Sequence, residues 1–265
     1  MGYDTSDTRA VRLGMLTPSS NTVLEPTTTA MLSGLPDVTA HFSRFKVTEI
    51  ALGEQALGQF DDSGILRAAE LLAHAKVDVI AWNGTSASWL GLDRDERLCE
   101  RILGATGVRA CTSILAFREI FSAAGIRRIG LVTPYTKDVQ ERIVSTWAAA
   151  GMTCIAERHL GLSDNFSFAE VEERRVADLI VEIARRGCDA VAVVCTNMRG
   201  ARLAEGLEDQ LGIPVYDSIA TTVWKSLRLA GVEPSRVHGW GSLFGGTPRR
   251  REPVPGGPND QEMPL

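Results

Sequence analysis

The sequence predicts an α/β protein of two pseudo-symmetric lobes, each a mainly parallel sheet flanked by helices, with the active site between the lobes. Three pairs of matching segments predict this architecture: Arg12–Pro18 with Arg128–Pro134, Val77–Ser86 with Cys188–Asn197, and Thr106–Ile114 with Leu211–Ile219. The pairs occur in the same order and lie 116, 111 and 105 residues apart. Three matches in register indicate a duplicated unit.

The matched segments are predicted to be strands. Each is a short apolar run that ends in Pro, Gly, Ser or Thr, such as RLGMLTP and RIGLVTP. Apolar runs without alternation are typical of strands covered on both faces, as in a parallel sheet. Helical patterns lie between them, at Ser63–Lys76, Arg94–Gly104, Ile114–Ala124, Lys137–Ala150, Phe168–Arg186, Arg199–Leu211 and Ile219–Ala230. This alternation predicts right-handed βαβ units.

The repeat also divides the chain. We assign residues 11–115 and 220–245 to the first lobe, and residues 116–219 to the second. The helix from Ile219 and the segment Gly239–Phe244 are expected to return and cover the first lobe. Residues 1–10 and the Pro/Gly/Arg-rich residues 246–265 are predicted to be flexible termini.

Composition excludes several classes of partner. The 265 residues are 44% hydrophobic and carry a net charge of −5 without a long basic run, so neither nucleic acid nor an anionic membrane is expected. No apolar stretch is long enough to cross a membrane, and the N-terminus lacks the order of a signal peptide. Five cysteines at irregular spacing, without a CxxC pair, predict reduced thiols in the cytoplasm and neither a disulfide framework nor a metal site. GWGSLFGG lacks the strand–turn–helix context of a phosphate loop, so nucleotide binding is not expected.

The predicted site lies where the strands end. Ligands of open α/β sheets bind outside the carboxyl ends of the strands. Here those ends carry hydroxyl, amide and thiol side chains, in the turns 17–21, 84–86, 133–135 and 195–197. If the lobes face each other, all four turns meet in one cleft. Small hydroxyls and backbone N–H groups bind carboxylates and other oxyanions.

Each candidate also has a purely structural interpretation. Cys195 at a strand end is compatible with a small buried hydrophobic residue. Tyr135 is compatible with a packed aromatic, Asn21 with a cap of the following helix, and Asn165 with an ordinary turn residue. The matched position of Cys195 is Gly84, which also sits at a turn, and this pairing favours the functional interpretation.

The motifs resemble a known family. Five motifs, PSSNTVLEP, GTSASWLG, TPYTKDVQERI, DN at Asp164–Asn165 and CTNMRG, resemble the aspartate/glutamate racemase superfamily. Within it they look most like the branch of maleate isomerases and arylmalonate decarboxylase, and NGTSASWLG also resembles the racemase-like protein of ectoine utilisation. The resemblance implies a homo-oligomeric enzyme that binds small carboxylates between its lobes without a cofactor.

The resemblance also assigns roles to residues. Racemases and maleate isomerases of this superfamily carry one cysteine per lobe; the second falls on Cys195, and the first falls on Gly84, as in arylmalonate decarboxylase, which leaves that position empty. The resemblance predicts that the substrate carboxylate is bound by Ser19, Asn21, Thr85, Ser86, Tyr135, Asn165, Thr196 and Asn197.

One thiol restricts the chemistry. Racemisation with two bases needs a group on each face of the substrate, and maleate isomerisation needs a thiolate that adds to the double bond, which the resemblance assigns to the first lobe. Asn21 and Asn165, however, match the carboxylate-binding pattern of maleate isomerases, so the resemblance leaves both decarboxylase-like and maleate-isomerase-like chemistry open. Loss of carbon dioxide would form the carbanion without a second thiol, and Cys195 would then protonate it. Two alternatives stay open. One is a racemase or isomerase whose second base is Ser86, Ser88 or a bound water, and the other is a protein that binds a carboxylate without converting it.

Overall fold

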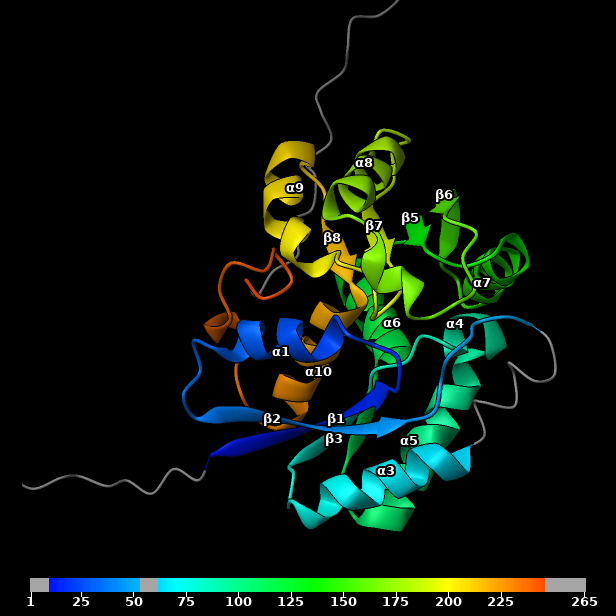
Figure 1. Ribbon diagram of the computed structural model, residues 1–265. Coiled ribbons are helices and arrows are strands. Elements are labelled where there is room, and N and C mark those ends of the chain that lie inside the picture. Colours follow the sequence, from blue (N-terminus) through cyan, green and yellow to red (C-terminus); the bar gives the residue numbers. More distant parts are fainter. Residues whose placement is uncertain (1–9, 53–61, 246–265) are drawn as a thin grey trace, which may run out of the picture.

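The computed structural model describes residues 10–52 and 62–245 and contains two four-stranded parallel sheets (Figure 1). Their strand orders are β2-β1-β3-β4 and β6-β5-β7-β8. The strands of the first sheet are β1 (Val11–Pro18), β2 (Val38–Phe45), β3 (Val79–Trp82) and β4 (Ala110–Thr112). Those of the second are β5 (Arg128–Thr133), β6 (Thr153–His159), β7 (Ala190–Val193) and β8 (Val215–Asp217). The identical order confirms the predicted α/β fold of two similar lobes.

The duplication extends to individual hydrogen bonds. Asp78 precedes β3, and its backbone N–H donates to the carbonyl of Arg12 at 2.8 Å while its carboxylate accepts from the Arg12 N–H at 2.8 Å. Asp189 precedes β7 and bonds Arg128 in the same two ways, at 2.7 and 2.9 Å. The start of each central strand is therefore fixed to its neighbour in the same register.

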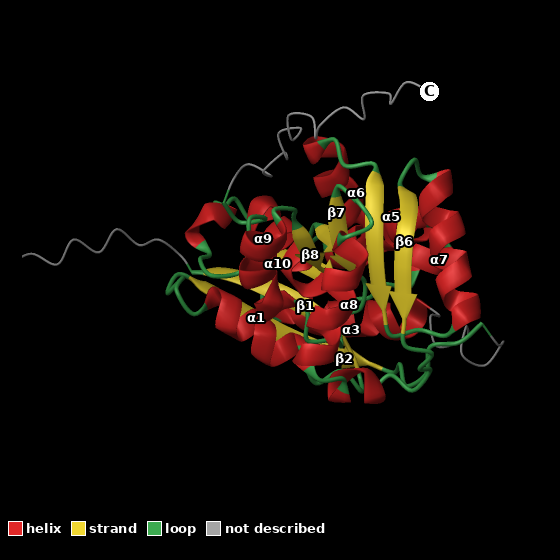
Figure 2. Ribbon diagram, turned by 90° about the horizontal axis from the view of Figure 1, so that it is seen from above, coloured by secondary structure: helices red, strands yellow, loops and turns green. Residues whose placement is uncertain are grey.

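Helices surround the strands of both sheets (Figure 2). They are α1 (Leu24–Leu32), α3 (Asp62–His74), α4 (Ala87–Leu90), α5 (Leu92–Thr106), α6 (Ser113–Ala124), α7 (Lys137–Ala149), α8 (Glu173–Ala184), α9 (Ala204–Leu211) and α10 (Ser218–Leu229), with 3₁₀ turns η1 (Ser167–Glu170), η2 (Ala201–Leu203) and η3 (Pro234–Arg236). The helix predicted over Phe168–Arg186 is interrupted, because Val171 is extended between η1 and α8. The helix predicted over Arg199–Leu211 begins as the 3₁₀ turn η2 at Ala201 and continues as α9 from Ala204.

The edge strands β2 and β6 were not predicted. Most of their side chains are only half-buried, and both segments contain His and Arg among apolar residues. An edge strand has only one neighbour and need not be apolar on both faces. Their sequences consequently lack the continuous apolar runs that identify the central strands.

The last helix of each lobe packs on the other lobe. Phe117 and Phe121 of α6 pack on Trp147 of α7, with ring centroids 5.8 and 5.9 Å apart, and Phe121 also contacts Tyr216 of β8 at 5.9 Å. In exchange, α10 follows β8 but lies beside α1 and against β3 and β4 (Figure 1). The two helices also contact each other, through a 2.7 Å hydrogen bond between Ser113 and Thr222.

The sequence predicted that the segment after α10 covers the first lobe. The segment contacts both lobes. The Ser242 hydroxyl bonds the carboxylate of Glu208 in α9 at 3.0 Å, and Arg202 lies over the Trp240 ring at 4.9 Å. A surface hollow lined by both Met31 of α1 and Trp240 completes the link to the first lobe. The predicted flexible termini lie outside the described residues, apart from Ala10.

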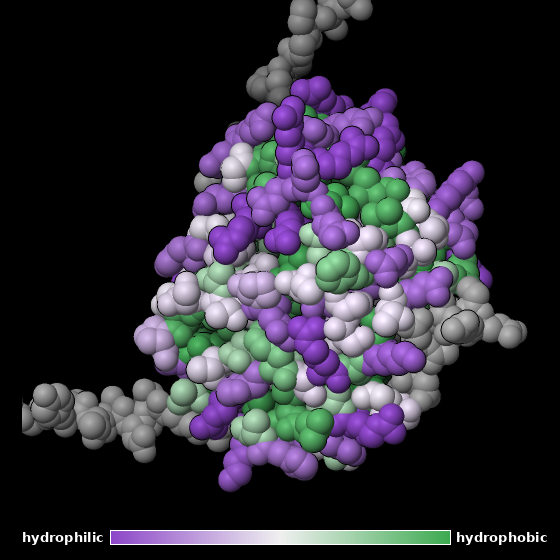
Figure 3. Space-filling model, in the orientation of Figure 1, coloured by the Kyte–Doolittle hydropathy of each residue, from purple (hydrophilic) through white to green (hydrophobic). Residues whose placement is uncertain are grey.

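The visible surface of the described residues is mostly polar. On the face seen in Figure 3, polar residues cover most of the surface and apolar residues form small groups among them. Within residues 10–52 and 62–245, no helix is long and apolar enough to cross a bilayer.

Candidate active site

The four polar turns meet at one place between the lobes. The Asn21 amide donates to the carbonyl and hydroxyl oxygens of Thr196 at 3.0 and 3.1 Å. The Thr196 hydroxyl donates to the Asn83 carbonyl at 3.0 Å, and the Thr85 hydroxyl bonds the Tyr135 hydroxyl at 2.7 Å. Each turn is thus joined to a turn of the other lobe.

Cys195 lies at the centre of this meeting point. It follows the fully buried β7, is 3% exposed, and its sulfur accepts a 3.3 Å hydrogen bond from the Asn197 N–H. Burial raises the pKa of the thiol to about 12, although the Asn197 N–H and the nearby Tyr135 hydroxyl act in the opposite direction, and the Asp217 carboxylate raises it further. The thiol therefore keeps its proton at neutral pH and is suited to donate it.

Tyr135 is held in place beside Cys195 by its aromatic neighbours. Its ring makes edge contacts with Trp89 and Phe168, at 5.3 and 5.6 Å between centroids, and only 2% of the residue is exposed. Burial, together with the negative charge that Cys195 would carry, raises the pKa of the phenol. Tyr135 is both a packed aromatic and a polar group at the site, so the two interpretations of the sequence hold together.

Gly84, the predicted position of the missing second cysteine, has no side chain, and the Trp82 indole fills the space that a side chain there would need. A Cβ atom at Gly84 would overlap Cζ2 and Cε2 of the Trp82 indole and would lie 2.8 Å from its Nε1. Trp82 is 1% exposed and also packs on Phe45, with ring centroids 4.7 Å apart, so it has no free space to move into. Gly84 is therefore required by the position of Trp82.

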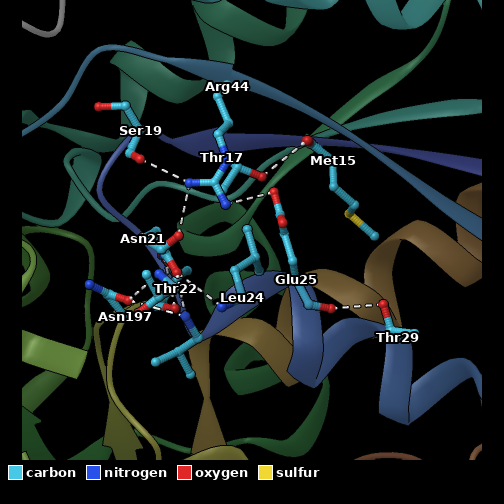
Figure 4. Close-up of polar contacts among 12 residues, drawn as sticks. Met15, Thr17, Ser19, Asn21, Thr22, Leu24, Glu25, Thr29, Arg44 and Asn197 are labelled. Carbon is cyan, nitrogen blue, oxygen red and sulfur yellow. Dashed lines mark hydrogen bonds and ion pairs between the residues drawn. The ribbon is translucent and has the colours of Figure 1, made fainter. Parts of the chain in front are cut away.

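Asn21 already uses its side chain within the protein. Its Oδ1 accepts from the backbone N–H groups of Val23 and Leu24 at 3.0 and 2.9 Å, at the start of α1 (Figure 4). This is the helix-capping role that the sequence suggested, and the amide donates across the lobes to Thr196. A substrate carboxylate that binds Asn21 must replace one of these bonds.

Asn165 and Asn197 belong to the same link between the lobes. Asn197 accepts from the Thr22 N–H at 3.0 Å (Figure 4). Its amide donates to the Asn165 carbonyl at 2.5 Å. The Asn165 amide donates to the Ser20 hydroxyl at 2.7 Å. All three predicted asparagines are brought together between the lobes: the amides of Asn21 and Asn165 donate across, and Asn197 accepts across.

The predicted serines differ in position. Ser19 is exposed and its hydroxyl donates to the Val47 carbonyl at 3.2 Å, so it faces the segment after β2. Ser86 is buried beside Thr85 at the start of α4, where its side chain makes no capping bond. The Ser88 hydroxyl donates to the Thr85 carbonyl at 2.6 Å. Its proton is therefore already engaged, whereas a second acid/base at Ser88 would have to give this proton to the substrate.

Arg44 is a residue that the sequence analysis missed. Its guanidinium donates to the carbonyls of Ser19 and Asn21 at 2.9 and 3.0 Å and pairs with Glu25 at 2.9 Å (Figure 4). These bonds hold the backbone of the turn 17–21 in place, and the Glu25 carboxylate neutralises the charge of Arg44. Arg44 lies on the edge strand β2, which has no clear pattern, so no signal in the sequence pointed to it.

Metal binding finds no support in the part of the chain that the structure describes. There, no three or more His, Cys, Asp or Glu side chains are grouped so that they would hold an ion. The site consists of hydroxyls, amides, one thiol and one indole.

Comparison with known proteins gives consistent matches. The family model described as arylmalonate decarboxylase matches residues 13–244. A maleate isomerase of Geobacillus stearothermophilus is 26% identical over 89% of this chain and 97% of its own length. An arylmalonate decarboxylase of Bordetella bronchiseptica is 30% identical over 63% of this chain and 70% of its own length. The crystal structure of a cysteine-to-alanine variant of maleate isomerase from Pseudomonas putida S16 with maleate has a TM-score of 0.81 and 27% identity, and covers 89% of this chain and 98% of that one.

Proposed function

Since the chain belongs to the arylmalonate decarboxylase family, we propose that it removes one carboxyl group from a small malonate-type acid and that Cys195 protonates the carbanion. The observation that carries this proposal is the asymmetry of the two strand ends. Cys195 is a buried, protonated thiol, and Trp82 excludes any side chain at Gly84. A reaction that needs only one proton donor fits this arrangement.

The proposed reaction balances with one thiol. The bond between the α-carbon and one carboxyl carbon breaks, carbon dioxide leaves, and the electron pair stays on the α-carbon, delocalised into the remaining carboxylate as an enediolate. The Cys195 S–H then gives its proton to the α-carbon, and the thiolate recovers a proton from solvent. No redox partner is required.

Hydroxyl groups are available to stabilise the enediolate. Thr85 and Tyr135 share one hydrogen in their mutual bond, so one hydroxyl hydrogen of the pair remains for an oxyanion or for the Cys195 sulfur. Ser86 and the backbone N–H groups after Cys195 lie next to them. Loss of a single donor to such an oxyanion typically costs about 3–4 kcal/mol of barrier height.

Maleate isomerisation is the activity named for two of these relatives, and this chain departs from its requirements. It needs a thiolate that adds to the double bond, which the resemblance assigns to the first lobe. Gly84 has no side chain, and the Cys195 thiol is protonated. We therefore favour decarboxylation.

The test is an assay of the wild-type protein against malonate, methylmalonate, phenylmalonate, maleate and an N-acetylamino acid in D₂O. We expect carbon dioxide release from a malonate and one deuterium at the α-carbon of a single product enantiomer. Conversion of maleate to fumarate, or deuterium exchange into unreacted amino acid, would instead establish the isomerase or racemase alternative. Binding of these acids without conversion of any would favour a carboxylate-binding protein.

We also propose a cytoplasmic location. All five cysteines lie within the described residues and are free, and a reducing compartment would preserve the Cys195 thiol. Fractionation of the native cells should recover the protein with cytoplasmic markers, and recovery from an oxidising compartment would contradict the proposal.

A further inference from the structure

Trp82 is a buried polar group that the proposed reaction does not yet use. Its Nε1–H is buried and has no hydrogen-bond partner among the residues that the structure describes, which is costly for an indole N–H. Buried donors of this kind are usually satisfied by protein, water or ligand. The groups around the Trp82 N–H indicate whether its partner is water or a ligand.

The N–H edge of the indole faces Gly84. The atoms nearest to a Cβ at Gly84 would be Cζ2, Cε2 and Nε1 of Trp82, which all belong to this edge. The indole also packs on the Phe45 ring, with ring centroids 4.7 Å apart, and the Trp82 carbonyl accepts from the Ser113 hydroxyl at 3.4 Å. The indole is therefore fixed with its donor at the residue that corresponds to Cys195.

Gly84 itself lies between two contacts with the second lobe. The residue before it, Asn83, accepts the Thr196 hydroxyl through its carbonyl, and the residue after it, Thr85, bonds Tyr135 beside Cys195. The unpartnered N–H thus lies at the backbone that forms the first-lobe side of the candidate site.

We propose that Trp82 is the first-lobe counterpart of Cys195: its N–H binds a carboxylate or enediolate oxygen of the substrate, and its ring closes the face turned away from the thiol. This inference rests on the proposed function and adds a substrate-binding residue to it. It predicts that the ligand is an anion with an oxygen acceptor on the first-lobe side. It also predicts that protonation is confined to the Cys195 face, since the indole leaves no room for a second donor.

The chain provides a matched control. Trp147 is also 1% exposed and its Nε1 also lacks a partner, but it packs between α6 and α7 on Phe117 and Phe121, away from the four turns. Trp82→Phe and Trp147→Phe therefore both remove a buried indole N–H and keep an aromatic ring. Only the first should affect an anion at the site.

The experiment is an NMR titration of the full chain with malonate. The indole resonance that is missing in Trp82→Phe identifies the Trp82 N–H, and we expect malonate to shift it in the wild type together with the backbone amides of Thr196 and Asn197. Trp82→Phe should weaken malonate binding about tenfold or more, since a hydrogen bond to a charged group is lost, while Trp147→Phe should bind within twofold of wild type.

The outcomes separate the two proposals. If malonate shifts the amides of Thr196 and Asn197 but leaves the Trp82 indole unchanged, or if both variants bind like wild type, the inference is overturned and the proposed function stands. Equal weakening in both variants would show a merely structural effect and would also overturn it. If malonate shifts none of these resonances, the malonate-type site fails, and the inference fails with it.

Discussion

The ends of β3 and β7 have the same backbone arrangement but opposite side chains. Each strand pairs with the first strand of its lobe, Trp82 opposite Leu16 and Val193 opposite Val132. Two residues later the first lobe has Gly84 and the second has Cys195. In the first lobe the large side chain, Trp82, lies within the strand. In the second lobe the side chain at this place, Cys195, lies after the strand. In the proposed reaction the two lobes therefore have different roles: the second lobe supplies the proton, and Trp82 of the first lobe closes the other face of the substrate.

The same contrast recurs at the last strand of each sheet. Thr112 caps α6 through a 3.1 Å bond from the Leu115 N–H, and Asp217 caps α10 through a 2.7 Å bond from the Ile219 N–H. The first lobe uses a neutral cap and the second an ionisable one. Asp217 is fully buried, its second oxygen lacks a partner, and burial raises the pKa of its carboxyl to about 7.

Replacement of the thiol should have the largest effect. Cys195→Ala removes the only group proposed to protonate the carbanion, and we expect kcat/KM to fall by about 10²–10⁴-fold on the best malonate, measured by carbon dioxide release. Cys154→Ala, on the edge strand β6, is the control and should retain activity. Undiminished turnover in Cys195→Ala would remove the functional difference between the two strand ends.

Restoring a side chain in the first lobe should reduce stability. Gly84→Ala places a methyl group against the Trp82 indole, and we expect the free energy of unfolding to fall by about 1–3 kcal/mol in urea denaturation. Gly104→Ala in α5 is the control, because no atom lies within 4 Å of its added Cβ.

A double mutant tests whether Trp82 is the residue that a side chain at Gly84 would overlap. In a Trp82→Leu background the overlapping ring atoms are absent, so the added cost of Gly84→Ala should become smaller than in wild type. An equal cost in both backgrounds would mean that Trp82 is not what excludes a side chain at Gly84.

The link between the lobes should respond to a smaller change. Asn21→Asp keeps the acceptor that caps α1 but loses the amide donors to Thr196, so we expect a loss of about 1–2 kcal/mol in the free energy of unfolding. Thr29→Ala on the exposed side of α1 is the control, with an expected change within about 0.5 kcal/mol. If both variants unfold at the same urea concentration as wild type, the bond between the lobes contributes nothing measurable.

The smallest expected effect is the pH dependence of stability that the ionisable cap Asp217 introduces and the neutral cap Thr112 does not. The raised pKa of Asp217 means that the folded state keeps a proton that the unfolded state releases near pH 4, so this group lowers stability as pH rises toward 7. We expect wild type to lose about 1 kcal/mol between pH 6 and 8 relative to Asp217→Asn, which retains a cap but does not titrate. Parallel stability curves for the two proteins would show that Asp217 titrates normally.

The sequence predicted what repetition and burial determine. The central strands β1, β3, β5 and β7 are apolar because both of their faces are covered, and the repeats then located the four polar turns that the structure joins. The assignment of these turns to substrate binding stays a prediction, as does a homo-oligomeric assembly. The start of α8 was misplaced because Val171 and Glu172, with ψ angles of 120° and 138°, interrupt an otherwise helical pattern.

The rest depends on contacts between segments distant in sequence. The position of the Trp82 ring over Gly84 depends on Phe45, which lies on an edge strand without a clear pattern. Arg44 holds a turn more than twenty residues before it. Asn21 was interpreted as a cap or a ligand for carboxylate, and its bond to Thr196 follows only from the way the lobes are placed together.

The exchange of α6 and α10 has a consequence for the origin of the chain. Each half lends its final helix to the other, so a fragment that ends after α6 would leave the aromatic face of that helix exposed and its own sheet partly uncovered. A half-length ancestor would therefore have completed its core only as a pair of identical chains. With both halves joined in one chain, the two strand ends are free to carry different residues, as Gly84 and Cys195 do.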